Sequence, residues 1–428
     1  MYDAIVIGAR CAGASTALHL ARAGHRVLLA DRATFPSDTM STHMVQPAGL
    51  AALQRWGLLD RLWETGCPRL EDLRMDFGPI ALDGPPPVDF GHVVIEGKPT
   101  PIDGIDYYAA PRRTALDNML VQAAVEAGAE LREGAPMREL LFEGDRVVGV
   151  RLGGENGNET EERATIVVGA DGMNSSVAKA VGAETYNESP SLTVGYYSYW
   201  SGIEDTRATL SPHPGRNIAE LPTNDDQTLV NVSWPVAEFH TVREDIEGHV
   251  QSSIEEHAPD LAERMRDAER TERFKGTAVV PNFFRKPHGP GWALVGDAGY
   301  HKDPIGAHGI MDALRHAELL AEAIGDGVSG AKPMDDALAG YQATRDERSA
   351  PLYFLNVQLA ELNPGPEVLA VTGAIARAND PSDIGNLLGV ICGSVPPADF
   401  FTPENLARVL DAADVPMEVL AGGAAPAA

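Results

Sequence analysis

The sequence predicts an α/β fold in which a Rossmann-like dinucleotide-binding domain is interrupted by an antiparallel-sheet domain and followed by a helical C-terminal region. Three glycine-rich motifs predict this fold: residues 8–13 (GARCAG), 169–172 (GADG) and 296–309 (GDAGYHKDPIGAHG). Each motif follows an apolar run, as loops after buried parallel strands do. Such loops meet at one edge of a sheet, so the three motifs together indicate a dinucleotide held at both of its ends.

The first motif predicts a cradle for a diphosphate. It lies between an expected strand at 3–7 (DAIVI) and an expected helix at 12–23, so its glycines permit a tight turn and close helix packing. The diphosphate is expected on backbone amides at the positive end of the helix. Arg10 replaces the usual middle glycine, and its side chain must turn away from the phosphates or pair with them. A Rossmann-like unit without a ligand is the alternative. The predicted contacts are Gly8, Cys11, Ala12 and Gly13.

The second expected strand, at 26–30 (RVLLA), leads directly into an acidic residue. Asp31 lies about 23 residues after the first glycine of the motif, which is near the usual distance for an acid that hydrogen-bonds an adenosine ribose. We therefore assign Asp31 and its neighbour Arg32 to the cofactor site. Met137, the first residue of an expected β-hairpin, is assigned to that site as well.

The remaining elements alternate between the two expected domains. A composition shift at 72–107 marks a first excursion out of the Rossmann-like domain. An amphipathic helix is expected at 113–127, and a strand at 165–168 leads into the second motif. Short segments rich in Tyr, Thr, Val and Trp at 192–234 predict an antiparallel sheet over a pocket. From residue 309 onward the pattern is mostly helical.

With these motifs, the chain resembles the group A flavoprotein monooxygenases, which have the para-hydroxybenzoate hydroxylase fold, over roughly residues 1–345. Flavin-dependent halogenases and geranylgeranyl reductases share that superfamily. The resemblance implies that the dinucleotide is FAD and that the domains are discontinuous. The FAD-binding domain is expected at 1–71, 108–185 and 271–345, the substrate-binding domain at 72–107 and 186–270, and the C-terminal helical region at 346–428.

The resemblance gives roles to two further segments. In that family the Asp-Gly of the second motif serves FAD and the passing nicotinamide, and this chain has Asp171 there. The arginine that usually follows is replaced by Ala178 and Lys179, so the nicotinamide contact stays open. Arg113 matches the arginine that opens a long helix and reaches toward the FAD chain, with Arg112 as its rival and a solvated surface arginine as the alternative.

The third motif is expected to hold the flavin itself. The resemblance implies that Asp297 binds the ribityl chain and that Pro304 lies beside the flavin ring. The loop from Gly306 to Gly309 is implied to place its amides at the N1/O2 edge, where a reduced flavin carries negative charge. Met311 stands where the family often has asparagine. A capping or turn role is the alternative for Asp297, and a turn role for the aspartate of the second motif.

One loop and two tryptophans are candidates for the substrate side. The loop 41–43 (STH) occupies the place where the family lines the flavin ring, so His43 is the acid–base candidate, with a structural loop histidine as the alternative. Trp200 and Trp234 suit an aromatic substrate wall, although positions in the core of a sheet are the better interpretation. The twelve histidines show no ligand spacing, so we expect no metal site.

Composition excludes several partners. The formal net charge of −28 argues against nucleic acids and anionic membranes. The three cysteines show no paired spacing, which favours a reducing cytosol. The sequence has no run of 18 apolar residues, so we expect no membrane span. We therefore expect a cytoplasmic protein. The sequence leaves its oligomeric state open.

By this resemblance we expect a FAD-dependent monooxygenase. NAD(P)H, as a transient co-substrate, would reduce the flavin, and O2 would form a C4a-hydroperoxide that an apolar pocket protects. The implied substrate is an aromatic or polyketide-like small molecule. A reductase of the geranylgeranyl reductase type is the first alternative. A halogenase is disfavoured because the chain lacks a WxWxIP motif, and a flavin-binding protein without turnover is the remaining alternative.

Overall fold

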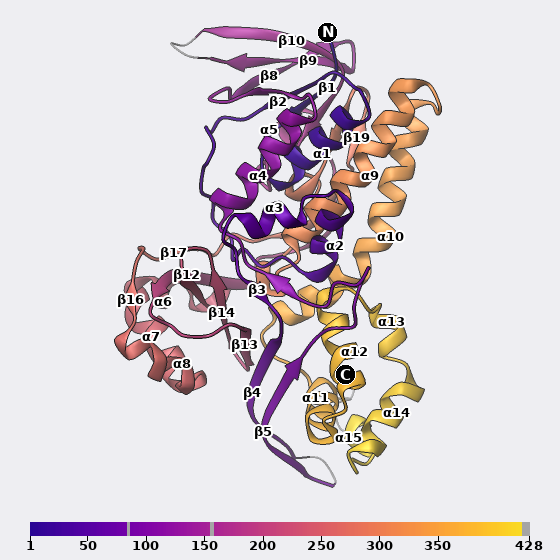
Figure 1. The fold of residues 1–428 in the computed structure, drawn as a ribbon. Coiled ribbons are helices and arrows are strands. Elements are labelled where there is room, and N and C mark those ends of the chain that lie inside the picture. The colour runs from indigo at the N-terminus through magenta and orange to yellow at the C-terminus, as the bar shows by residue number, and fades with distance from the viewer. Residues whose placement is uncertain (84–85, 155–157, 422–428) are drawn as a thin grey trace.

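The computed structural model describes residues 1–83, 86–154 and 158–421. Figure 1 shows an elongated molecule with a large α/β region at the top, a smaller lobe of strands and short helices at the lower left, and a group of helices at the lower right. The predicted α/β class is confirmed.

The upper region is built on a sheet whose core strands are parallel. The parallel strands are β1 (Tyr2–Ile7), β2 (Val27–Ala30), β7 (Glu130–Arg132), β10 (Glu159–Gly169) and β20 (Trp292–Leu294), and β19 (His288–Gly289) pairs antiparallel with β20 at one edge. Their order is β19-β20-β10-β1-β2-β7, and β10 pairs in parallel with both β1 and β20. The carboxyl ends of β1, β10 and β20 therefore meet at one edge, and a glycine-rich motif follows each of them.

Helices cover this sheet and fix the position of the motif loops. They include α1 (Cys11–Arg22), α4 (Arg113–Glu126), α9 (Gly309–Ser329) and α10 (Met334–Ala360). Helix α1 packs between α4 and α9 through buried alanines and leucines, and α10 packs on α9. The predicted helices 12–23 and 113–127 are confirmed to within about one residue. Gly24 and Gly128 follow them with φ of 86° and 109°, a backbone conformation that favours glycine at a helix end.

A second sheet forms the lower lobe. Its strands are β4 (Leu73–Leu82), β5 (Val88–Gly97), β12 (Thr193–Ser201), β13 (Ala208–His213), β14 (Arg216–Thr223), β15 (Gln227–Pro235), β16 (Glu269–Arg270) and β17 (Lys275–Thr277). The order is β16-β12-β15-β14-β13-β4-β5, with β17 beside β12. Strands from two distant segments, 73–97 and 193–277, therefore share one sheet. The exact domain boundaries stay predictions. The expected antiparallel sheet has one exception: β13 and β4, which a long connection separates, pair in parallel.

One face of the second sheet packs on α6 (Phe239–Glu244), α7 (Ile246–His257) and α8 (Pro259–Arg264). Trp200 and Trp234 both point into this core and are 6% and 0% exposed. The core interpretation of these tryptophans is thereby confirmed. The other face carries Tyr197, Asn231 and their neighbours at alternate positions and faces a cavity.

The C-terminal helices cover the far side of that cavity. They are α11 (Pro366–Ala378), α12 (Pro381–Cys392), α13 (Pro397–Phe400), α14 (Pro403–Ala412) and α15 (Glu418–Ala421). Helices α11 and α12 pack on β5, and α11 also contacts β4. Figure 1 shows this group below α10, beside the long β4–β5 hairpin.

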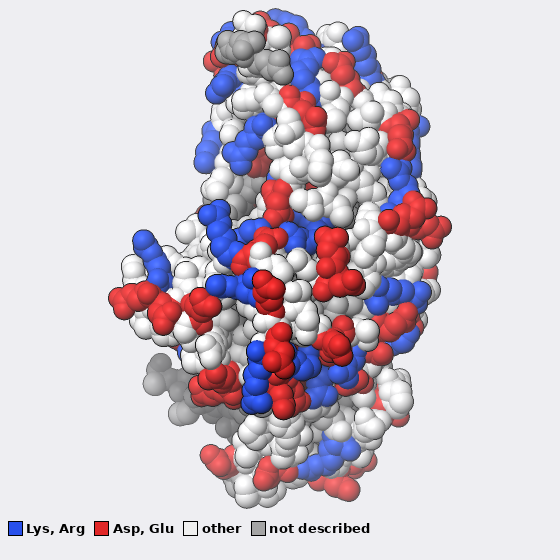
Figure 2. Space-filling model, turned by 60° about the vertical axis from the view of Figure 1, so that its left-hand side comes forward, with Lys and Arg blue, Asp and Glu red and all other residues white. Residues whose placement is uncertain are grey.

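Short elements complete the fold. They are α2 (Pro47–Arg55), α3 (Leu59–Glu64), β3 (Arg69–Leu70), β6 (Tyr108–Ala109), β8 (Met137–Glu143), β9 (Arg146–Gly153), α5 (Ser176–Ala180), β11 (Thr185–Ser189), β18 (Asn282–Arg285), β21 (Tyr300–His301), and 3-10 turns at Val236–Glu238, Met265–Asp267, Gly296–Ala298 and Pro304–Gly306. Among the helices that the structure describes, none combines the length and apolar character that crossing a membrane requires. On the face shown in Figure 2, acidic and basic side chains are interspersed.

Candidate functional site

A single cavity of about 1290 Å³ begins at the carboxyl end of β2 and extends to the C-terminal helices. This volume exceeds the roughly 300–1,000 Å³ of a pocket for one small ligand. The loops of all three glycine-rich motifs border it. Of the predicted cofactor residues, those at its border are Gly8, Cys11, Ala12, Asp31, Arg32, Arg113, Met137, Asp171, Asp297, Pro304, Gly306 and Gly309.

The first motif forms the floor of one end of the cavity. Gly8 has φ of 101°, and a Cβ atom there would lie 2.4 Å from the carbonyl oxygen of Ala170. A Cβ atom on Gly13 would lie 1.8 Å from the carbonyl oxygen of Gly8, so Gly13 permits helix–strand packing. Gly13 was also predicted to contact the cofactor. It does not border the cavity, because it packs against the end of β1. The N-terminus of α1 has no side-chain cap and carries no acid in its first turn, which suits a diphosphate.

The Arg10 side chain borders the cavity and is held by other residues of the chain. Its guanidinium donates to a carboxylate oxygen of Asp117 at 2.8 Å and to the carbonyl oxygen of Asp38 at 2.8 Å. Asp117, which is fully buried on α4, also accepts from Arg113 at 2.9 Å. One carboxylate thus fixes both arginines. Arg113 borders the cavity, whereas Arg112 lies 3.8 Å above the ring of Tyr199, outside that border.

Two of the expected cofactor acids also hold the backbone. The Asp31 carboxylate accepts from the amide of Ala9 at 2.6 Å and from that of Ala33 at 2.8 Å, so it fixes the first motif at the expected adenosine end. The Asp171 carboxylate accepts from Ser175 Oγ at 2.5 Å and from the Ser176 amide at 2.6 Å. Asp171 therefore caps α5 at the edge of the cavity, a role that the sequence did not reveal.

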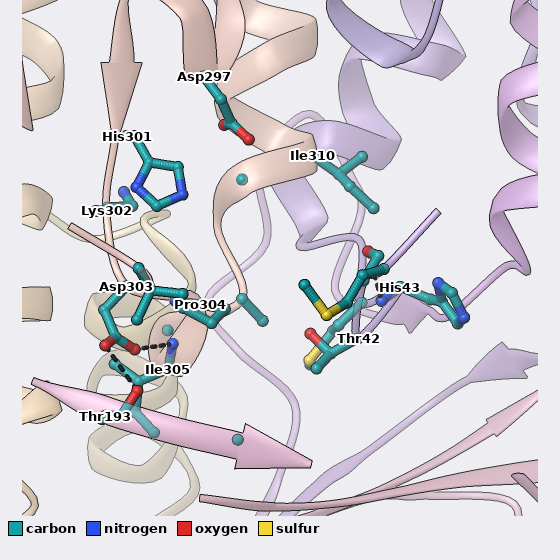
Figure 3. A pocket seen from close by; sticks show the side chains of 18 of the residues that line it. Thr42, His43, Thr193, Asp297, His301, Lys302, Asp303, Pro304, Ile305 and Ile310 are labelled. Atoms are coloured by element: carbon teal, nitrogen blue, oxygen red, sulfur yellow. Dashed lines mark hydrogen bonds between the residues drawn. The ribbon is translucent and has the colours of Figure 1, made fainter. Parts of the chain in front are cut away.

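The third motif presents an acid and a helix N-terminus to the cavity. The Asp297 side chain is exposed there, and no described residue hydrogen-bonds to its carboxylate. Figure 3 shows Asp297, Pro304 and Ile310 around an open space. Helix α9 starts at Gly309 without a side-chain cap, and a Cβ atom on Gly309 would meet no atom within 4 Å. An acid for ribityl hydroxyls and free amides for the flavin N1/O2 edge fit FAD.

A buried ion pair joins this loop to helix α9. Lys302 Nζ is 2.8 Å from a carboxylate oxygen of Asp312 on α9 and donates to the Tyr300 hydroxyl at 3.1 Å. Both charged side chains are less than one-tenth exposed. Neither residue was predicted from the sequence to belong to the site. The sequence did contain one signal for this pair. Lys302 lies inside a motif whose other residues are expected to be buried, and a buried lysine needs an acidic partner.

Asp303 is a second buried acid beside the loop. Its carboxylate accepts from Thr193 Oγ1 at 2.7 Å and from the Ile305 amide at 3.1 Å, as Figure 3 shows. Burial raises the pKa of Asp303 to about 6, although these hydrogen bonds oppose the shift. Asp303 thus joins the third motif to the first residue of β12.

His43 lies at the cavity border but is anchored elsewhere. Its backbone has φ of 64°, its side chain is buried, and its Nε2 atom is hydrogen-bonded to the Tyr199 hydroxyl. In Figure 3 its ring lies on the side away from Asp297 and Pro304. Burial, with the nearby arginines, lowers the pKa of His43 to about 3, so the imidazole is neutral at physiological pH. This geometry favours a structural role, and the acid–base role stays a prediction.

The rest of the cavity is a chamber, defined as the part bordered by β4, β12–β15 and the chain from Leu355 to Phe401. Its sheet side corresponds to the antiparallel sheet at 192–234 that was predicted to lie over a pocket. Its helical side, from α10, α11 and α12, was not predicted from the sequence. Within the described parts of the chain, no group of three or more His, Cys, Asp or Glu residues is arranged to hold a metal ion.

Comparisons with known proteins agree with this geometry. The FAD binding domain family matches residues 1–353. A menaquinone reductase of Mycolicibacterium smegmatis is 26% identical over 388 residues, 87% of each chain. A 6-methylpretetramide 4-monooxygenase of Streptomyces rimosus is 26% identical over 324 residues, 74% of this chain and 73% of that protein. The structure of the flavin-dependent brominase Bmp2 is 18% identical with a TM-score of 0.75, covering 96% of this chain and 98% of the brominase.

The family match spans more than four-fifths of the 428 residues and includes all three glycine-rich motifs. The fold that these motifs predicted is confirmed by the likeness to the brominase structure. The chain belongs to the FAD binding domain family and is a FAD-dependent oxidoreductase.

Proposed function

We propose that this chain is a monooxygenase that uses NAD(P)H and O2 to hydroxylate an aromatic or polyketide-like small molecule. The observation that carries the proposal is the single cavity, which joins the FAD cradle to a chamber with room for a second molecule. Bound FAD supplies the redox chemistry and, once reduced, the reaction with O2. The residues of the chain supply binding, orientation and exclusion of water.

The chamber suits oxygen chemistry because much of its wall is apolar. Leu73, Met75 and Phe77 of β4 border it on one side, and Leu387 and Ile391 of α12 border it on the other. Such a wall keeps water from reactive intermediates and orients the substrate. The similarity to a 6-methylpretetramide 4-monooxygenase supports this assignment.

A reductase is the second candidate. The menaquinone reductase matches a larger share of this chain than the monooxygenase does, at the same identity. A reductase of this fold uses the same cradle and chamber without O2.

The deciding experiment is turnover of the FAD-loaded protein with NADH or NADPH, phenolic and polyketide-like candidates, isotope-labelled O2 and added bromide. We expect one labelled oxygen atom in the product and O2 uptake equal to the NAD(P)H consumed. A reduced product formed equally well without O2 would establish the reductase instead. A brominated product would establish a halogenase.

A further inference from the structure

We infer that the chamber binds an uncharged, oxygenated molecule, whose polar edge lies on a strip of buried amides and a hydroxyl and whose apolar body extends toward the C-terminal helices. This inference deepens the proposed function and rests on it only in taking the chamber as the substrate site. The polar strip consists of Asn217 on β14 and Asn231 and Ser233 on β15.

Strand register places the polar strip on one face of the second sheet. Ser233 is paired with Asn217 on one side and with Gly195 of β12 on the other. Asn231, two residues before Ser233, points to the same face and is paired with Tyr197. All three members of the strip border the cavity and are 9%, 7% and 7% exposed in the order Asn217, Asn231, Ser233.

The polar strip has hydrogen-bonding capacity to spare. Asn231 Nδ2 donates to Ser233 Oγ at 3.1 Å, but nothing in the described chain bonds to Asn231 Oδ1 or to the side-chain amide of Asn217. A Cβ atom on Gly195 would lie only 3.3 Å from Ser233 Oγ, so the glycine leaves space above the strip. These amide atoms open onto the cavity, so a ligand hydroxyl or carbonyl can hydrogen-bond to them in place of water.

The charges of the chamber argue against an anionic ligand. Among the described residues of β4, β12–β15 and α10–α12, Arg216 is the one Lys or Arg that borders the cavity. Both of its terminal nitrogens donate to Glu238, at 2.8 and 2.9 Å, so its charge is compensated. A carboxylate ligand would lose its hydration and find no unpaired cation.

The other side of the chamber is apolar. Leu210 of β13 is paired with Met75 of β4, and both border the cavity opposite α12. Leu359, Val368 and Phe401 also border it and are 38%, 46% and 40% exposed, so they stand where the cavity meets solvent. An apolar substituent is therefore accommodated from the polar strip out to this rim.

The test compares two probes that differ by one charge, 2-naphthol and 3-hydroxy-2-naphthoate. Each is titrated into the oxidised, FAD-loaded protein at neutral pH, and binding is followed by the change in the flavin absorbance spectrum. We expect 2-naphthol to bind at least roughly tenfold more tightly.

Three variants connect this preference to the named residues. Asn231→Leu should weaken 2-naphthol binding roughly tenfold, whereas Gln251→Leu, which changes an exposed amide on α7, should leave it unchanged. Glu238→Gln releases Arg216, so it should strengthen binding of the carboxylate probe roughly tenfold with little effect on 2-naphthol. FAD content and melting temperature show that each variant is folded.

The inference is overturned if the carboxylate probe binds as tightly as 2-naphthol, if neither probe perturbs the flavin, or if a folded Asn231→Leu protein binds 2-naphthol normally. The titrations contain no NAD(P)H. Their failure is therefore separate from failure of the monooxygenase proposal, which the labelled-O2 experiment decides.

Discussion

The flavin loop (residues 296–312) and the polar strip of the chamber border the same cavity, but they hold polar groups differently. The flavin loop contains formal charges: Asp297 faces the cavity, and Lys302 and Asp312 form a buried pair within the loop. The polar strip contains only amides and a hydroxyl. A buried ion pair therefore lies at the loop that is predicted to hold FAD, whereas the predicted substrate side presents uncharged polar groups on its sheet face and one arginine that is paired with Glu238.

The largest expected effect comes from breaking the buried pair of the flavin loop. Lys302→Met leaves the Asp312 carboxylate buried without its cation, which should lower the free energy of unfolding by about 3–5 kcal/mol. The double variant Lys302→Met/Asp312→Leu should regain most of that loss. Urea unfolding of the wild type, the single variant and the double variant measures both the loss and the recovery of unfolding free energy. A single variant as stable as the wild type would show that the loop does not depend on its charges.

The next effect concerns pH. The pKa of Asp303 is raised by burial from 3.8 to about 6, so the folded protein binds this proton more tightly than the unfolded chain. The resulting stability is fully present below about pH 4 and is lost as pH rises through 6. The loss amounts to roughly 3 kcal/mol for a shift of about two units. Asp303→Asn should flatten the curve of unfolding free energy between pH 4 and 7, and Asn231→Leu should not. An unchanged slope in Asp303→Asn would contradict the assignment.

Asp297→Ala should weaken FAD binding by roughly ten- to a hundredfold, because it removes a charge-assisted hydrogen bond worth about 1.5–3 kcal/mol. Fluorescence titration of the apoprotein with FAD measures the dissociation constant. Asp297→Asn keeps an acceptor without the charge, so its dissociation constant for FAD should lie between those of the wild type and Asp297→Ala. Equal affinities would remove Asp297 from the cofactor site, and tighter binding of FMN than of FAD would contradict the role of the adenosine end.

The smallest effect concerns His43, which borders the same cavity. If His43 anchors its loop through Tyr199, His43→Ala and Tyr199→Phe should lower coupled turnover alike, by roughly fivefold for a bond worth about 1 kcal/mol. A general base would be worth about 10²-fold or more in His43→Ala alone, and that loss would shrink at high pH. Rates across pH for both variants separate the two roles.

The cofactor end was predictable because its signals are local. An apolar strand, a glycine turn and a small-residue helix follow one another within residues 2–22, so periodicity and backbone requirements locate them. The outcome for Arg10 was not predictable, because its partner Asp117 lies 107 residues away. Which of two arginines borders the cavity was likewise decided by the packing of α4.

The chamber was predictable only in part. Alternating strands at 192–234 indicated a sheet over a pocket, but the parallel pairing of β13 with β4 depends on register between distant segments. The helices after residue 345 gave no local signal of what they cover, because an amphipathic face indicates only that something packs on it. The spare capacity of Asn217 and Asn231 likewise depends on three strands meeting in one register.

The helical wall of the chamber has a consequence for how such proteins diversify. The family match ends at residue 353, while Leu355, Leu387 and Ile391 border the chamber beyond it. The predicted cofactor residues and the residues of the helical wall therefore lie in separate stretches of the sequence. We expect that exchanging the coding segment for residues 354–421 between relatives would change which apolar substituents the chamber accepts, while the polar strip on β14 and β15 stays with the rest of the chain.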